Sequence, residues 1–307
     1  MPRAALLLLA LGPAARAAPF SEGVEPVVRV LLREQGKRES CDFRGDGGLL
    51  VEADGEVVDV AGGVSVARDG DRLRVSGVAG RPRSVLLAAR AGLVFVEKRA
   101  YAGSVACRAG DGLEIVNRVG LENYVLGVLR GELPLRHVPV EAAAAQAVAV
   151  RSYALHYLAQ GRAGHDVDDT VLFQRYDGVQ RAPRDGELRA GVQATRGVYL
   201  AWDGKPLKAY YHSTCGGHTT DPRTGLGQEN LAPLSGTACD RCRASKYFRW
   251  EIVVPDADVA RAAGLSAPIR GVEVAERGAG GRVLAYRVAA GSGARTVPAG
   301  DFRMAVG

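Results

Sequence analysis

The sequence changes character near residue 121, and this change limits the folds that are open to the chain. Residues 49–119 contain short apolar runs separated by glycine, at 49–51, 57–60, 73–75, 85–87 and 93–96. Runs of this length with Asp-Gly and Gly-Gly turns between them are typical of strands. From residue 121 the apolar residues recur at helical spacing. The sequence therefore predicts an α+β protein, in which a β-rich N-terminal part (19–118) precedes a mixed α/β region (119–307).

One long helix is predicted in the second region, over residues 139–160. Pro139 and Glu141 are favourable in a first turn, the Ala-rich interior 142–147 forms helix strongly, and Gly161 ends it. A shorter helical stretch, 121–129, comes before Pro134. Further strands are predicted at 24–32, 197–202, 207–211, 271–274 and 283–288, together with a short helix at 257–263.

The first eighteen residues have the pattern of a secretory signal peptide. Arg3 precedes the apolar run 4–11, and Ala15-Arg16-Ala17-Ala18 is a small-residue cleavage signature. Elsewhere there is no apolar run of eighteen residues, so we expect no integral membrane span in the mature chain. These features predict a secreted, periplasmic or wall-associated protein.

The charge of the chain indicates which binding partners are favoured. The formal net charge is +6 and the pI is about 9.2, which suits anionic neighbours such as wall polymers. The basic residues are scattered among Asp and Glu, without a basic run, so nucleic-acid binding is disfavoured.

Several long motifs stand in a characteristic order. They are the Leu-Glu-Asn-Tyr run at 121–124, Gly-Glu-Leu-Pro at 131–134, the Pro-Val-Glu-Ala helix ending in Arg-Ser-Tyr at 139–153, Gln-Arg-Tyr-Asp-Gly at 174–178, Tyr-His-Ser-Thr-Cys-Gly-Gly-His-Thr at 211–219 and Tyr-Phe-Arg-Trp at 247–250. Together they resemble the SpoIID/LytB family. Two positions depart from its pattern: Ala144 stands where a Lys is frequent, and Leu133 replaces a Met.

This resemblance implies a peptidoglycan lytic transglycosylase that acts on glycan strands stripped of stem peptides. Glu132 matches the family's catalytic glutamate. A glycosidic bond needs an acid to protonate its leaving oxygen. In lytic transglycosylation the same carboxylate then accepts the proton of the muramic acid 6-hydroxyl, and a 1,6-anhydro ring closes. A second carboxylate is not required.

The resemblance also implies residues that bind the substrate. Arg151 is expected to orient Glu132 or to bind a sugar carboxylate, because a guanidinium grips carboxylates in bidentate fashion. The other expected sugar contacts are Gln174, Tyr176, His212, Ser213, Thr214, Tyr247 and Arg249.

Cysteine spacing predicts a metal site in the loop 212–246. Cys239 and Cys242 form a C-x-x-C pair, and Cys215 and His218 form a C-x-x-H pair about twenty residues upstream. Two such pairs make one Cys₃His site of the kind that binds structural Zn²⁺. His212 could replace His218. Disulfides compete with this interpretation in an exported protein, and Cys41 and Cys107 could pair with each other.

Three other functions are alternatives to lytic transglycosylation. A muramidase would use water in place of the 6-hydroxyl, and the sequence does not separate the two outcomes. A non-catalytic wall-binding protein would stimulate a partner N-acetylmuramoyl-L-alanine amidase, as described for other family members. A metallohydrolase is disfavoured because the chain has no H-E-x-x-H motif. The sequence leaves a role in sporulation open.

Overall fold

The structure is a computed structural model, and it describes residues 24–33, 38–134, 138–179, 185–228 and 231–306. The predicted signal peptide, 1–18, lies outside these residues. The chain divides into two compact units, Met1–Tyr210 (unit 1) and Tyr211–Gly307 (unit 2). The unit boundary coincides with the start of the predicted Cys/His loop. Across the described ranges, no helix combines the length and the apolar character that crossing a bilayer requires.

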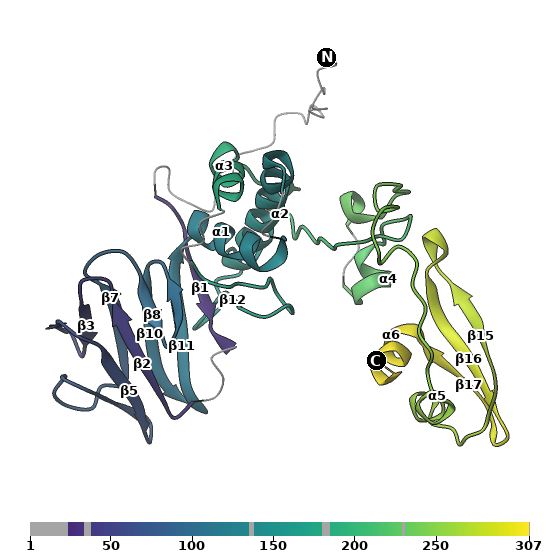
Figure 1. Cartoon of the computed structure of the whole chain (residues 1–307), viewed down its shortest axis with the longest axis horizontal. Coiled ribbons are helices and arrows are strands. Elements are labelled where there is room, and N and C mark those ends of the chain that lie inside the picture. Colours follow the sequence, from purple (N-terminus) through teal and green to yellow (C-terminus); the bar gives the residue numbers. More distant parts are fainter. Residues whose placement is uncertain (1–23, 34–37, 135–137, 180–184, 229–230, 307) are drawn as a thin grey trace, which may run out of the picture. The chain divides into compact units, whose positions relative to one another are not determined.

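Unit 1 contains two antiparallel-rich sheets (Figure 1). The larger sheet has the order β12-β1-β11-β10-β7-β3-β4, with strands at Val167–Asp168, Val27–Leu31, Gly112–Gly120, Ser104–Gly110, Ser84–Ala89, Leu49–Ala53 and Glu56–Val60. The smaller has the order β6-β5-β2-β8-β9, with strands at Arg72–Val75, Val64–Asp69, Ser40–Gly45, Val94–Val96 and Arg99–Tyr101. The strands predicted between residues 49 and 96 are therefore confirmed.

Alternating burial explains how these strands pack. In β3, Leu49, Val51 and Ala53 are buried, whereas Leu50 and Glu52 are exposed. Successive side chains point to opposite faces of a sheet, so this period of two buries one face and leaves the other to solvent. The core of unit 1 lies where the buried faces of the two sheets meet.

Three helices cover the end of the larger sheet: α1 (Leu121–Glu132), α2 (Val140–Leu158) and α3 (Gly186–Ala194). α1 begins directly after the last residue of β11, and α2 is the predicted long helix. Small side chains let α2 and α3 approach closely. A Cβ on Gly191 would lie 2.7 Å from the Cβ of Ala143, which is fully buried.

Residues 197–211 differ from the predicted pair of strands. Only Ala201–Trp202 (β13) and Lys205–Pro206 (β14) pair, and 207–210 form no strand. Side chains on α2 bind the backbone here instead: Ser152 Oγ accepts from Leu200 N (2.8 Å), and Arg151 Nη1 donates to Val198 O (2.8 Å). Because the helix satisfies these polar groups, the segment needs no partner strand.

Unit 2 contains a three-stranded sheet with helices. Its elements are α4 (Pro222–Leu226), α5 (Asp256–Ala263), β15 (Ile269–Arg277), β16 (Val283–Ala290), β17 (Gly293–Pro298) and α6 (Ala299–Val306). The predicted helix at 257–263 and the strands at 271–274 and 283–288 are present. A small core of Val259, Ala263, Val288 and Val297 joins α5 to the sheet.

Candidate functional site

Glu132 is the last residue of α1 and its side chain is exposed. The backbone amide of Arg175 donates a hydrogen bond to Glu132 Oε1 over 2.9 Å. Residue 132 belongs to one predicted motif and residue 175 to another, 43 positions later. The fold therefore brings the Gly-Glu-Leu-Pro and Gln-Arg-Tyr-Asp-Gly motifs together at the carboxylate.

Two glycines on one face of α1 allow this approach. A Cβ on Gly127 would lie 2.3 Å from the ring of Tyr176, and a Cβ on Gly131 would lie 2.5 Å from the carbonyl oxygen of Arg175. Both separations are far below van der Waals contact, so larger side chains would push residues 175–176 off the helix. The spacing of four residues puts both glycines on the same face.

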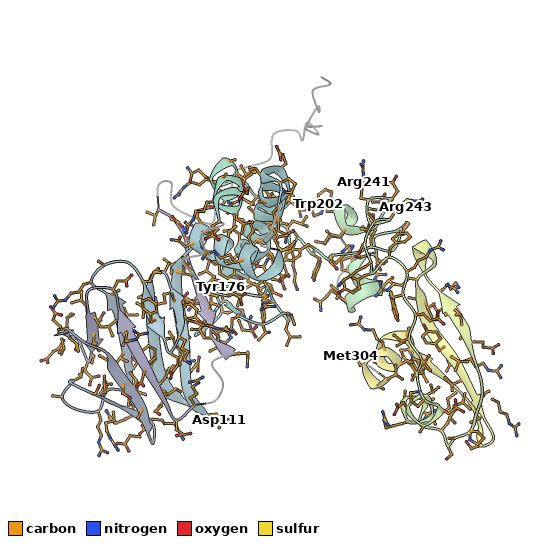
Figure 2. The ribbon with its side chains drawn as sticks, in the orientation of Figure 1. Asp111, Tyr176, Trp202, Arg241, Arg243 and Met304 are labelled. Carbon is orange, nitrogen blue, oxygen red and sulfur yellow. The ribbon has the colours of Figure 1, made fainter. Side chains whose placement is uncertain are left out.

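Gln174 and Tyr176 anchor this segment from inside the protein. Tyr176 is fully buried (Figure 2), and its hydroxyl donates to Asn117 Oδ1 over 2.8 Å. Its ring stacks on the Tyr124 ring, with 5.3 Å between the centroids. The Tyr124 hydroxyl in turn donates to Gln174 Oε1 (3.1 Å). Burial raises the pKa of Tyr176, so its hydroxyl stays protonated and remains a donor. In this structure the two side chains position the loop, which differs from the predicted direct contact with sugar.

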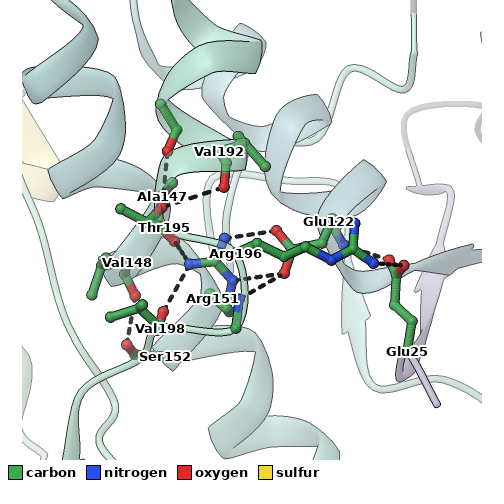
Figure 3. A network of polar contacts seen from close by, with 12 residues as sticks. Glu25, Glu122, Ala147, Val148, Arg151, Ser152, Val192, Thr195, Arg196 and Val198 are labelled. Atoms are coloured by element: carbon green, nitrogen blue, oxygen red, sulfur yellow. Dashed lines mark hydrogen bonds and ion pairs between the residues drawn. The ribbon is translucent and has the colours of Figure 1, made fainter. Parts of the chain in front are cut away.

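Arg151 is also fully buried, and it binds neither Glu132 nor solvent. Its Nε and Nη2 grip Glu122 Oε1 and Oε2 over 3.0 and 2.7 Å (Figure 3). Its Nη1 donates to Val198 O. The predicted bidentate carboxylate contact exists, but the carboxylate belongs to the first turn of α1. Arg151 therefore joins α1, α2 and the segment after α3.

Glu122 is a functional-looking residue that the sequence reasoning missed. Its amide donates to Glu25 Oε1 (2.9 Å), and Glu25 Oε2 accepts from Arg196 (3.0 Å; Figure 3). The one available signal was its place in the Leu-Glu-Asn-Tyr motif, because an acidic residue in a first helical turn is otherwise explained by the helix dipole.

Unit 2 holds the cysteine group. The Sγ atoms of Cys215, Cys239 and Cys242 all lie within 4.8 Å of one another, and those of Cys215 and Cys242 are 3.5 Å apart. All five cysteines are free thiols. The suggested Cys41–Cys107 disulfide is thus not formed here; both thiols are buried, and burial raises the pKa of Cys41 to about 12.

The three cysteines fit a thiolate metal site. Sulfur ligands at about 2.3 Å from a tetrahedral Zn²⁺ stand about 3.8 Å apart, close to the spacing seen. Amide groups point at the sulfurs: Gly217 N donates to Cys215 Sγ and Cys215 N donates to Cys242 Sγ, each over 3.5 Å. The amide of Gly217 lowers the pKa of Cys215, which favours the thiolate that a metal needs.

Neither histidine of the predicted ligand set belongs to this group. His218 Nδ1 lies 2.5 Å from the carbonyl oxygen of Thr219, and its ring packs on Gly280, where a Cβ would lie 2.5 Å from His218 Cγ. These contacts hold the imidazole away from the sulfurs. His212 is exposed. The structure thus assembles the three predicted cysteines without the predicted histidine.

The remaining predicted sugar contacts lie in unit 2 near the cysteines in sequence. Thr214 Oγ1 shares a hydrogen bond with Ser245 Oγ (2.8 Å), and Ser245 Oγ accepts from the amide of Tyr247 (3.2 Å). Ser213, Tyr247 and Arg249 are exposed. Arg241 and Arg243, on either side of Cys242, are exposed as well (Figure 2). Their contact with sugar stays a prediction.

Unit 1 is thus an α+β protein that presents a carboxylate at a helix end, tied to a distant loop through the backbone. Comparison with known proteins shows which family this part of the chain resembles. Residues 109–202 match the SpoIID family, described as stage II sporulation protein. The similarity to the SpoIID family thus covers one segment of the chain, which contains Glu122, Glu132, Arg151, Gln174 and Tyr176 but none of the three grouped cysteines.

The chain is also similar to individual proteins over part of their length. An uncharacterized protein of Brachyspira hyodysenteriae is 32% identical over 136 residues, which cover 44% of this chain and 36% of the relative. Stage II sporulation protein D of Bacillus amyloliquefaciens and that of Bacillus subtilis are each 31% identical over 118 residues, covering 34% of either chain. The chain thus matches about a third of the length of these relatives.

Proposed function

We propose that this protein is an exported peptidoglycan lytic transglycosylase with Glu132 as its general acid and base. The observation that carries the proposal is the hydrogen bond from Arg175 N to Glu132 Oε1, which fixes a carboxylate where two motifs of the SpoIID-matched segment meet. The donor of this bond is the backbone amide, so the bond does not depend on the side chain at position 175. The signal-peptide pattern at 1–18 supports export to the cell wall.

In the proposed reaction, the Glu132 carboxyl donates its proton to the oxygen that leaves C1 of N-acetylmuramic acid as that glycosidic bond breaks. The resulting carboxylate accepts the proton of the 6-hydroxyl on the same sugar, and the 6-oxygen bonds to C1. The products are a free N-acetylglucosamine hydroxyl and a 1,6-anhydro end. Glu132 is exposed in the free protein, so the bound glycan must exclude water around it.

We also propose that Cys215, Cys239 and Cys242 hold a structural Zn²⁺, with His218 or His212 as the fourth ligand after a change of rotamer. The support is the thiol geometry and the poor packing of the surrounding segment. Across the described part of residues 211–250, Pro222 alone is buried. A segment without its own apolar core needs another source of folding free energy, and a structural zinc supplies it.

The acid role of Glu132 is tested with peptide-free glycan strands. Wild-type protein is expected to release fragments with 1,6-anhydro ends, read by mass spectrometry, and Glu132→Gln is expected to slow release by at least about a hundredfold. Glu141→Gln is the matched control, because Glu141 is an exposed acid in the first turn of α2. Equal cleavage by wild type and Glu132→Gln would remove Glu132 as the acid, and fragments with reducing ends would identify a muramidase.

The exposure of Glu132 favours one alternative, a wall-binding protein that stimulates an N-acetylmuramoyl-L-alanine amidase. A binding protein has no need of a desolvated acid. If neither wild type nor Glu132→Gln cleaves glycan, while both raise the rate of a purified wall amidase on intact sacculi, this alternative holds and the transglycosylase proposal fails.

A further inference from the structure

A cavity of ≈ 330 Å³ opens on the face of the larger sheet that points away from the core of unit 1. Its floor is apolar: Ala106 and Val116 are direct partners in the β10–β11 register. Its remaining lining is rich in arginine and comes from β1, β7, β10, β11 and the turn after α2. The lining residues are Arg29, Ser84, Ala106, Cys107, Arg108, Glu114, Val116, Arg118 and Gly164.

At one end of the cavity two arginines stand side by side. Arg29 and Arg118 are direct partners in the β1–β11 register, and like charges in that position repel. Asp166 neutralises Arg29 through bonds of 2.6 and 3.1 Å to its Nη2 and Nε. Arg118 is exposed and has no hydrogen-bond or ion-pair partner within the described ranges. Its charge is therefore left for a ligand to neutralise.

At the other end of the cavity, the arginine side chain is held by an ion pair. Arg108 Nη2 binds Glu114 Oε1 over 2.6 Å. A Cβ on Gly164 would lie 3.0 Å from Arg108 Nη2, so the glycine lets the turn after α2 close against this guanidinium. Three guanidinium groups and one lining carboxylate thus surround an apolar floor, and with Arg29 and Arg108 paired the net positive charge is that of Arg118.

We propose that this cavity binds an oxyanion, a carboxylate or a phosphate, carried by an anionic polymer, with Arg118 as the principal donor. A guanidinium offers two parallel N–H donors to either group. The apolar floor accepts the carbon skeleton next to the anion. That the polymer belongs to the cell wall rests on the proposed function; the anion site itself does not. Arg118 and Glu132 flank opposite ends of α1, about 18 Å in length, so this site differs from the proposed site of cleavage.

Binding of polyglutamate and polyphosphate to the full chain, measured by calorimetry, tests the proposal. Arg118→Gln is expected to weaken binding about tenfold, the effect of one lost hydrogen-bonded charge. Arg74→Gln is the matched control, since Arg74 is an exposed strand arginine of the smaller sheet. Ala106→Phe fills the floor without changing charge and is expected to weaken binding to a similar degree. Binding of polyglutamate alone identifies carboxylate as the ligand, and binding of polyphosphate alone identifies phosphate.

Three results would overturn the proposal: no binding of either polymer by the wild type, equal affinities for Arg118→Gln and Arg74→Gln, or wild-type affinity for Ala106→Phe. Thermal unfolding shows that each variant is folded. Glu132→Gln is measured in parallel and is expected to bind as the wild type does. Polymer binding without glycan cleavage would therefore reject the proposed function and keep the anion site, and cleavage without polymer binding would do the reverse.

Discussion

At the scale of single residues, Arg151 and Glu122 belong to the sequence motifs near the candidate site, but in the structure they form an ion pair that holds two helices together. Their two-bond contact is buried, with 0% of the Arg151 side chain and 13% of the Glu122 side chain exposed. Buried ion pairs add little to the free energy of folding compared with apolar residues of the same shape. Loss of one partner is nevertheless costly, because the other charge then remains buried without a counter-charge. The pair therefore fixes how α1 and α2 meet, and with them the helix end that carries Glu132.

We predict that Arg151→Met lowers the free energy of unfolding of unit 1 by about 3–5 kcal/mol, because it leaves Glu122 without its counter-charge. Arg151→Met combined with Glu122→Leu is expected to recover much of this loss. Urea unfolding followed by fluorescence measures both.

Arg90→Met is the control for that pair, because Arg90 and Asp59 form an exposed ion pair and its loss is expected to cost less than about 1 kcal/mol. Equal destabilisation by Arg151→Met and Arg90→Met would mean that the buried contact has no special role.

At the scale of elements, the contact between α1 and residues 174–178 forms the candidate site. Gly127 and Gly131 form the contact surface of α1. The Tyr176 ring packs against Gly127, and the Arg175 amide donates a hydrogen bond to Glu132. An outward shift of the loop would break the buried hydrogen bond between Tyr176 and Asn117, so this bond holds the loop against α1.

Gly131→Ala is predicted to displace the Arg175 amide from Glu132 and to reduce glycan cleavage at least tenfold. Gly127→Ala is predicted to destabilise unit 1 by about 1–3 kcal/mol through overpacking against the Tyr176 ring. Cleavage rates and urea unfolding measure the two effects.

Gly186→Ala provides the comparison, since a Cβ at this helical glycine meets no atom within 4 Å. It should leave activity unchanged and stability equal or slightly higher. If Gly131→Ala retained full activity, the contact between α1 and the loop would not position the acid.

The elements were largely predictable, but the contacts between them were not. The strands from 49 to 96 could be predicted from their short apolar runs, and α2 from its alanine content, because both signals are local in the sequence. The Arg175–Glu132 bond joins residues 43 positions apart, and no local pattern encodes it. The burial of Gln174 and Arg151 was missed for the same reason. Polar residues are usually exposed, and only partners in the folded protein offset the free-energy cost of burying them. The strand predicted at 207–211 is absent, and the α2 side chains Arg151 and Ser152 bind the backbone of the preceding predicted strand at Val198 and Leu200 instead.

At the scale of the whole molecule, the two units differ in what stabilises them. Unit 1 has a continuous apolar core between its sheets and helices. In unit 2 the apolar cluster involves α5 and the sheet, whereas the described part of 211–250 has little buried surface. The cysteine group lies in this weakly packed part.

Removal of metal is therefore predicted to act on unit 2 alone. Treatment of the zinc-loaded chain with a chelator should raise hydrogen exchange in residues 212–246 and leave the strands between 49 and 120 protected. Cys239→Ser should lose the bound metal, as measured by elemental analysis.

Cys107→Ala is the matched variant, because Cys107 is a buried cysteine outside the group, and it should keep one zinc per chain. A zinc content of Cys239→Ser equal to that of the wild type would exclude these thiols as ligands.

The position of β1 has a consequence for how this family segment can be used. Residues 109–202 include β11 and β12, but these strands do not touch: β1, from the beginning of the described chain, lies between them and pairs with both. An excised piece bounded by the family match would lack β1 and most of β10, which are the two neighbours of β11, and would leave both edges of β11 and the β1-facing edge of β12 unpaired. The matched segment is thus not expected to fold alone, and a minimal folded fragment has to include β1 (Val27–Leu31).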